Sequence, residues 1–219
     1  MKKVLVVILS LITSASFAQI RKGNTVIEKT RIGLFGGLSL ANQIVSDPYG
    51  NAYSDNAKAG GIAGISVIAP ISYGWYFQPE ITYSNMGTTY SDDQIYSGKK
   101  NLNMNYLSVP LLFKYSEPFS GLGILFGPQY GYLLNANIAP TGSFKNNYGK
   151  ADVTSDWKRS DISGVVGLEY YFPNNGTPGP KFGLSARYQF GFLNVNNGGV
   201  SDNSRVTNSG FFITAGVRF

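Results

Sequence analysis

The segment KFGLSARYQFGFL, residues 181–193, alternates between two kinds of side chain along almost its whole length. The even positions from 182 to 192 are Phe, Leu, Ala, Tyr, Phe and Phe, whereas the odd positions from 181 to 191 are Lys, Gly, Ser, Arg, Gln and Gly. Successive side chains of a β-strand point to opposite faces of the sheet. The segment therefore predicts a strand with one apolar, aromatic-rich face and one polar face.

Seven further segments alternate in a similar way, and Gly, Asn, Ser, Asp and Pro separate them. Beyond residue 18 no stretch shows a sustained helical period. The sequence thus predicts an all-β chain of eight antiparallel strands. We expect the strands at 31–41, 58–69, 72–84, 102–115, 121–134, 160–172, 181–193 and 210–219.

The connections between these strands alternate between long and short. Residues 42–57, 85–101, 135–159 and 194–209 form long connections, and the connections near 70–72, 116–121 and 173–180 are short. Transmembrane barrels have short turns at one end and long loops at the other. This alternation predicts an up-and-down transmembrane β-barrel.

Charged residues within the predicted strands lie on the polar face. A Lys or Arg side chain that faces lipid near the midplane costs about 2–4 kcal/mol, so a membrane barrel keeps charge on its inner face. We expect the inner charges to form a structural ion network, although a ligand site or a gated path would use the same residue types. The expected network comprises Glu80, Lys114, Glu169, Lys181, Arg187 and Arg218.

Aromatic residues and prolines mark particular positions along the strands. Outward-facing aromatic residues are expected in two girdles. One girdle comprises Tyr73, Trp75, Tyr115, Phe172 and Phe219, and the other Tyr83, Tyr130, Tyr132, Phe192 and Phe211. Pro79, Pro110 and Pro128 each remove a backbone donor from a strand, so we expect β-bulges at these positions.

The two ends of the chain carry export and assembly features. Residues 1–18 combine Lys2 and Lys3, a short apolar run and a small-residue site ending at Ala18, which predicts a secretory signal peptide. Residues 19–30 are then a periplasmic segment and residues 31–219 the barrel, with both termini periplasmic and the long loops extracellular. Phe211, Val217 and the terminal Phe219 lie on one face and resemble a signal read by the outer-membrane assembly machinery.

Composition restricts the chemistry that the chain can perform. It contains no Cys and no His, which excludes disulfides, zinc sites of the His/Cys type and His-dependent nucleophiles. The 18 basic residues exceed the 12 acidic ones without forming a run, so no nucleic-acid surface is indicated. We expect no enzyme, no cofactor and no metal site. A hydrolase or acyltransferase would need an acid/base pair outside the ion network.

Several strands also resemble a known family. The segments NYLSVPLLFKY (105–115), GILFGPQYGYLL, DISGVVGLEYYF, GLSARYQFGFLNV and FFITAGVRF are similar to those of PorT-like outer-membrane β-barrels of Bacteroidetes. The resemblance spans about residues 30–219 and implies an eight-stranded barrel in the outer membrane. Ser108 stands where we would expect an acidic residue.

The expected function is that of a monomeric outer-membrane barrel with a filled lumen and a structural or surface-interaction role. Its partners would be outer-membrane lipid, the assembly machinery and an extracellular ligand at the loops. The alternatives are a narrow channel or transporter for small hydrophilic solutes and an accessory barrel of a secretion system. Recognition and simple solvation are both consistent with the loop aromatics Tyr49, Tyr53, Tyr90, Tyr96, Tyr148 and Trp157.

Overall fold

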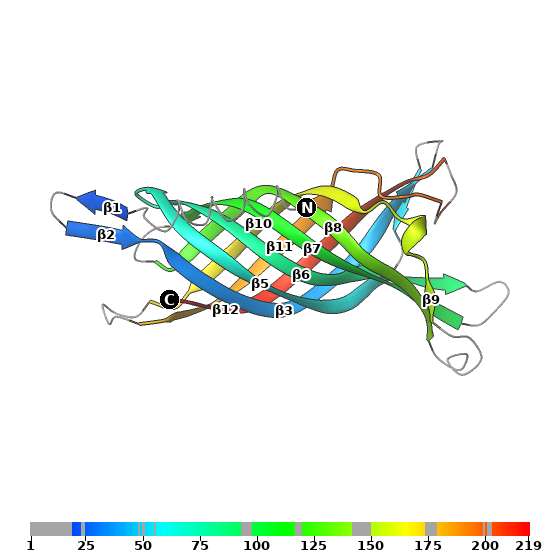
Figure 1. Cartoon of the computed structure of the whole chain (residues 1–219), viewed down its shortest axis with the longest axis horizontal. Coiled ribbons are helices and arrows are strands. Elements are labelled where there is room, and N and C mark those ends of the chain that lie inside the picture. Colours follow the sequence, from blue (N-terminus) through cyan, green and yellow to red (C-terminus); the bar gives the residue numbers. More distant parts are fainter. Residues whose placement is uncertain are drawn as a thin grey trace.

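The chain forms a closed barrel of eight antiparallel strands, as the sequence predicts (Figure 1). The computed structural model describes residues 19–22, 25–47, 49, 51–54, 56–92, 98–116, 120–141, 150–173, 179–198, 200 and 203–219. Each strand pairs with its neighbour in sequence, and pairing of the last strand with the first and of β8 with β10 completes the closed ring. The strands are β3 (Arg31–Ser46), β5 (Asn56–Ser72), β6 (Trp75–Asp92), β7 (Gly98–Ser116), β8 (Leu122–Thr141), β10 (Ser160–Tyr171), β11 (Lys181–Gly191) and β12 (Arg205–Arg218).

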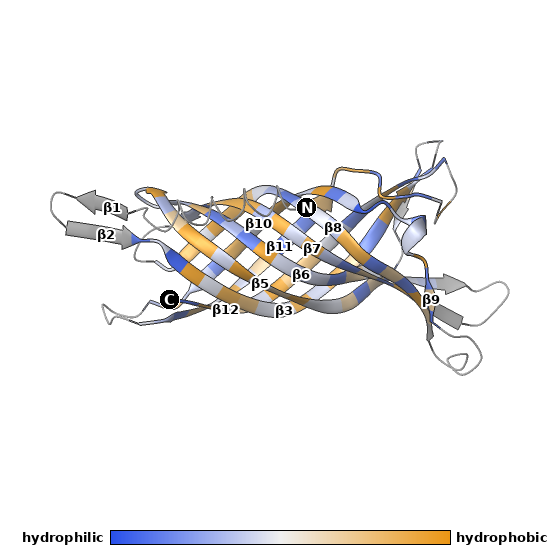
Figure 2. Ribbon diagram, in the orientation of Figure 1, coloured by the Kyte–Doolittle hydropathy of each residue, from blue (hydrophilic) through white to orange (hydrophobic). Residues whose placement is uncertain are grey.

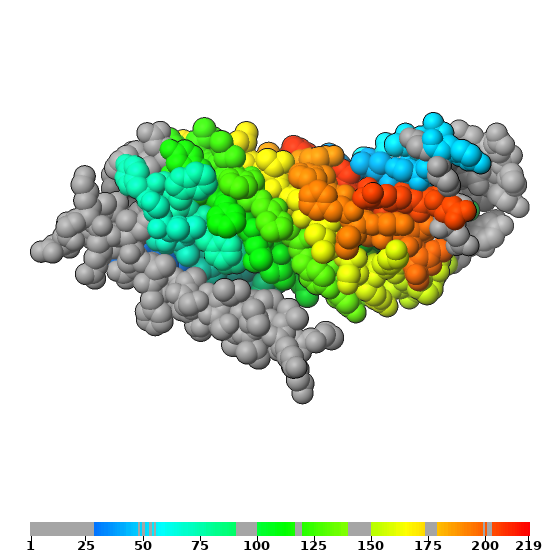
Figure 3. Space-filling model, turned by 90° about the horizontal axis from the view of Figure 1, so that it is seen from above, coloured from blue at the N-terminus to red at the C-terminus, as the bar shows by residue number. Residues whose placement is uncertain are grey.

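Side chains divide between an apolar outer face and a polar inner face. On β11, Leu184 is 53% exposed on the outside, whereas Arg187 is only 6% exposed on the inside. Apolar residues form a broad band around the barrel, and hydrophilic residues become more frequent toward the end with the long loops (Figure 2). The side chains of successive strands lie next to one another along this outer surface (Figure 3). The alternation in the sequence therefore predicts which side chains of each strand point outward and which point inward.

Several strands continue beyond their expected ends on the side of the long loops, which we call the loop end. β6 reaches Asp92, β7 begins at Gly98 and β8 reaches Thr141. The opposite end, where short connections join the strands, is called the turn end. The strand extensions lie beyond the apolar band, where the outer face no longer has to be apolar and the alternation disappears.

The prediction of β-bulges at the three prolines is wrong. Pairing skips two positions around each proline but resumes in the same register, as Pro79↔Leu111 followed by Thr82↔Ser108 shows. Proline removes a hydrogen-bond donor without adding a residue, so the ladder loses a bond and keeps its spacing. Register shifts occur elsewhere in the barrel, between Ala57/Ile62, Pro70/Ser72 and Asn105/Tyr106.

Smaller elements extend from both ends of the barrel. A hairpin of β1 (Gln19–Lys22) and β2 (Thr25–Lys29) precedes β3 at the turn end (Figure 1). At the loop end, β4 (Ala52–Ser54) pairs with β3 and β9 (Ala151–Asp152) pairs with β8, followed by the short 3-10 helix η2 (Thr154–Asp156). No helix in the described ranges is long and apolar enough to cross a membrane. The expected signal peptide, residues 1–18, lies outside the described residues.

Candidate functional site

Ion pairs connect five strands across the turn-end half of the barrel interior. Arg187 of β11 donates to Glu80 of β6 at 2.6 Å. Glu169 of β10 accepts from Arg218 of β12 at 2.6 Å and lies 2.7 Å from the ammonium of Lys114 on β7. All five side chains are at least nine-tenths buried. Burial of unpaired charges would be costly, so each carboxylate compensates the cations beside it.

Gln78 connects these ion pairs into one continuous network. Its amide nitrogen donates to Glu80 at 2.7 Å, and its amide oxygen accepts from Arg218 at 3.3 Å. Gln78 is not among the residues expected from the sequence. Its position two residues before Glu80 places it on the same inner face of β6, which is the signal that would have found it.

Each cation of the network also lies over an aromatic ring. The Arg218 guanidinium is 3.5 Å from the ring centroid of Tyr171, Lys114 is 4.8 Å from that of Tyr76, and Arg187 is 5.1 Å from that of Phe35. A cation over a ring face gains about 0.5–2 kcal/mol, more when it is desolvated. The rings also occupy the space between the charged groups.

Lys181 is the remaining residue of the expected network. It is half-buried at the turn end, opposite Arg218 in the β11–β12 pairing. Both residues line a small pocket of about 80 Å³ at this end of the interior, together with Arg31, Lys114 and Tyr171. The structure thus brings five of the six expected residues into one ion network and places Lys181 at its turn-end margin.

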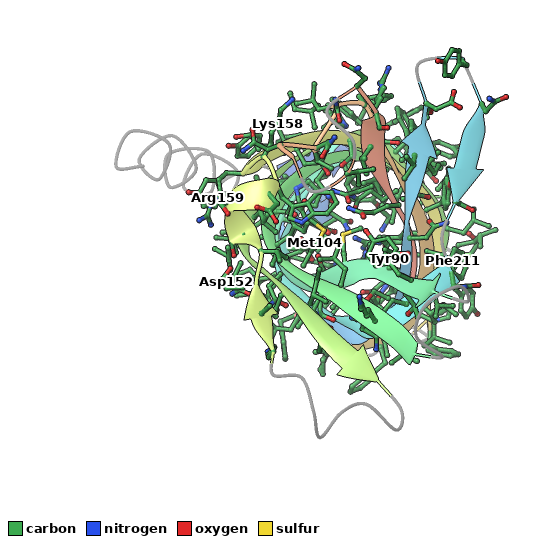
Figure 4. The ribbon with its side chains drawn as sticks, turned by 90° about the vertical axis from the view of Figure 1, so that its right-hand side faces the viewer. Tyr90, Met104, Asp152, Lys158, Arg159 and Phe211 are labelled. Carbon is green, nitrogen blue, oxygen red and sulfur yellow. The ribbon has the colours of Figure 1, made fainter. Side chains whose placement is uncertain are left out.

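An apolar cluster fills the loop-end half of the interior. Leu102, Met104 and Leu133 are fully buried there. Trp157, which follows η2, is 4% exposed and belongs to the same cluster. Tyr90 of β6 packs against this cluster. Figure 4, which looks onto the loop end, shows Met104 and Tyr90 inside the ring of strands. Trp157 and Tyr90 are therefore interior residues rather than surface aromatics.

A polar layer that was not expected from the sequence lies between the ion network and the apolar cluster. Asn208 donates to Asp161 at 2.9 Å and to the Tyr106 hydroxyl at 3.0 Å. Gln129 of β8 donates to Gln189 of β11 at 3.0 Å, over the inner face of β10, which lies between these two strands. Asp161, Ser163 and Glu169 occupy alternate positions of β10 and therefore point to the same face. This spacing would have indicated that Asp161 points inward.

The other expected surface residues occupy varied positions. Tyr49 is 91% exposed, and Tyr96 and Tyr148 lie outside the described residues. Phe211 and Phe219 are 40% and 62% exposed on the outer face. The carboxylate of Asp47 accepts backbone N–H groups of its own loop, and the part of the chain that the structure describes contains no acidic cluster of metal-site type.

A closed barrel with an apolar outer face and charged residues inside is the arrangement of a membrane-spanning β-barrel rather than a soluble one. The chain matches the family model "Outer membrane protein beta-barrel domain" over residues 17–197, and it belongs to this family. No curated protein sequence matches the chain.

Solved structures with a similar fold come from several bacteria. Ail of Yersinia pestis, solved in complex with the heparin analogue sucrose octasulfate, is 16% identical, with a TM-score of 0.45 over 88% of this chain and all of that one. Neisserial surface protein A is 16% identical, with a TM-score of 0.42 over 86% and 95% of the two chains. The N-terminal barrel domain of Pseudomonas aeruginosa OprF is 14% identical, with a TM-score of 0.39 over 87% and 96%.

Proposed function

We propose that this chain is a monomeric, non-enzymatic protein of a Gram-negative outer membrane that interacts with its surroundings through the loop end and does not conduct solutes. In this proposal residues 1–18 are a cleaved signal peptide, both termini are periplasmic and the loop end is extracellular. Phe211, Val217 and Phe219 present an assembly signal. The PorT-like resemblance of the strands supports the finer assignment to that group.

Buried side chains in both halves of the interior are the observation that supports this proposal. The ion network from Lys114 to Arg187 occupies the turn-end half, and the apolar cluster around Met104 occupies the loop-end half. Eight strands enclose a space just wide enough for side chains to fill. A permeating solute would have to separate buried ion pairs and then cross an apolar layer, and both steps are costly.

The first test is the location of the mature protein. Because the outer face carries the apolar band, we expect the protein to fractionate with outer membranes and to show heat-modifiable migration in detergent gels. A surface-accessible tag inserted after Tyr49 should be labelled in intact cells, whereas a tag inserted after Tyr73, in the turn between β5 and β6, should not. Recovery as a freely soluble monomer without detergent would contradict the membrane placement.

A second test addresses the lumen. Purified protein in planar bilayers is expected to give no stable, porin-like current, because in this proposal the ion network and the apolar cluster block the lumen. Long-lived ohmic steps that survive proteolytic trimming of the loops would contradict the filled-lumen proposal. That result would favour the alternatives, a narrow channel for small hydrophilic solutes or an accessory barrel of a secretion system.

A further inference from the structure

A pocket at the loop end combines cations with the edge of the apolar band. Its volume is about 710 Å³, and its lining includes Lys158, Arg159, Ser160, Leu193 and Asn194. It opens on the outside of the barrel, since Lys158, Arg159 and Ser160 are all exposed. Figure 4 shows Lys158 and Arg159 at the rim of the barrel, away from the interior residues. The interior network and this pocket are therefore separate sites.

Backbone contacts hold the Arg159 guanidinium and the main chain at Lys158 in position. The guanidinium of Arg159 donates through Nη1 to the carbonyl oxygens of Leu133 and Leu134, at 3.0 and 2.7 Å. The backbone N–H of Lys158 donates to Val195 at 2.8 Å, and the adjacent Trp157 is buried in the apolar cluster. Arg159 keeps its Nε and Nη2 donors for other partners, because an arginine side chain has five N–H donors in all.

A third cation flanks the pocket. Arg205 of β12 is exposed and donates to the carbonyl oxygen of Phe192, the residue before Leu193 in the pocket lining. Among the residues that the structure describes, no carboxylate lies within salt-bridge distance of Lys158, Arg159 or Arg205. The positive charge of this surface is therefore not neutralised by ion pairs.

The neighbouring carboxylates Asp152 and Asp156 form hydrogen bonds within their own segments, although Arg159 lies close enough to Asp152 to contribute to the lowering of its pKa. Asp152 accepts hydrogen bonds from the backbone N–H and the hydroxyl of Thr154, and the hydroxyl bond first of all holds the pKa of Asp152 below its ordinary value. Asp156 accepts from the Ser155 hydroxyl at 3.0 Å. Asp161 is 2% exposed and faces the interior. None of these three carboxylates forms a salt bridge with the cations of the pocket in the part of the chain that the structure describes.

The pocket lies directly beside the expected loop-end girdle. Ser160 is paired with Tyr132 and lies 3.0 Å from the hydroxyl of Tyr130. Tyr130 and Phe192 are 44% and 51% exposed on the outer face. Aromatic residues of this kind lie at the level of the lipid headgroups. Lys158 and Arg159 therefore lie where lipid phosphates are found, and Leu193 continues the apolar surface toward the acyl chains.

We propose that Lys158, Arg159 and Arg205 form a binding site for the phosphate of a membrane lipid in the leaflet at the loop end. Arginine donors match the oxygens of a phosphate group, and lysine adds a mobile ammonium. The hydroxyls and amides of the pocket provide further donors. A soluble phosphate would use the cations alone, whereas a lipid also gains the contact of its chains with the apolar band. The site deepens the proposed function, on whose membrane placement it rests.

The test compares phosphatidic acid with diacylglycerol of the same acyl chains, each added to the folded, detergent-solubilised barrel. We expect phosphatidic acid to remain bound in native mass spectrometry and to raise the temperature of the heat-modifiable transition, and diacylglycerol to do neither. Lys158→Gln together with Arg159→Gln should weaken binding about tenfold or more, because two charge-assisted contacts are lost. Lys158→Glu provides a second variant that leaves the Arg159 contacts to the barrel wall intact.

A matched control removes the same charge elsewhere at the loop end. Lys100 and Lys150 are also exposed, so Lys100→Gln with Lys150→Gln should bind phosphatidic acid like the unmodified protein. Equal losses in both double variants would overturn the site, since charge alone would then explain binding. Displacement of the lipid by equimolar inorganic phosphate would overturn the assignment to a lipid. Fractionation and conductance do not depend on these residues, so failure here is distinguishable from failure of the proposed function.

Discussion

Replacement of Glu169 by Gln is expected to destabilise the barrel by about 3–5 kcal/mol, the cost of breaking a buried ion pair by removing one partner. Glu169 accepts from Arg218 and pairs with Lys114, so the neutral amide leaves both cations without their shared carboxylate. The free energy of unfolding from lipid vesicles, measured by urea titration, checks this value. Asp152→Asn is the control, because Asp152 is exposed outside the network.

The cross-barrel pair provides an independent measure of the same network. Glu80→Leu and Arg187→Leu should each be strongly destabilising, whereas the double replacement should cost less than the two singles added together. Removing both partners leaves no uncompensated charge behind. Strict additivity would show that the 2.6 Å contact between Glu80 and Arg187 contributes no coupling to stability.

Replacement of Leu184 by Arg is expected to destabilise the protein by about 2–4 kcal/mol if the residue lies near the midplane. Leu184 is 53% exposed in the apolar band of β11, where an arginine would meet hydrocarbon. Phe192→Arg makes a matched control, because Phe192 lies at the loop-end margin of the band, where the cost falls to about 0–1 kcal/mol. The measurement is again the free energy of unfolding from vesicles.

The two arginine variants test whether the outer face of β11 contacts lipid and how far the apolar band extends. If Leu184→Arg unfolds at the same denaturant concentration as the unmodified barrel, then the outer face of β11 does not contact lipid. If Phe192→Arg is as destabilising as Leu184→Arg, the apolar band extends further toward the loop end than the girdle indicates. Both results can be read from the same titration series.

The number and facing of the strands could be predicted from the sequence, because lipid requires apolar residues on one parity of every spanning strand. The ends of the strands could not. β8 continues from the predicted limit at Leu134 to Thr141, through a segment that is polar on its outer side. Once a strand leaves the apolar band, water accepts polar side chains on its outer face, and the period of two that identified it is lost.

The inward direction of the charges could likewise be predicted, but their partners could not. Parity assigns Glu80 and Arg187 to the same interior, although 107 positions separate them in the chain. Which of them meet depends on the tilt and stagger of the strands, and a one-dimensional pattern does not contain this information. For the same reason Trp157 was expected at the surface. Only the packing of the loop over the lumen reveals that it is buried.

The pair between Glu80 and Arg187 also constrains the order in which the barrel is assembled. Their strands, β6 and β11, lie four strands apart in either direction around the ring. Before the first and last strands pair, the two charges therefore lie far apart on a curved, open sheet. The contact can form only when the ends of the sheet meet. It therefore stabilises the closed barrel and contributes little to the stability of an open intermediate. We expect insertion to proceed as one late, cooperative step, in which the last strands join and the two charges leave water together.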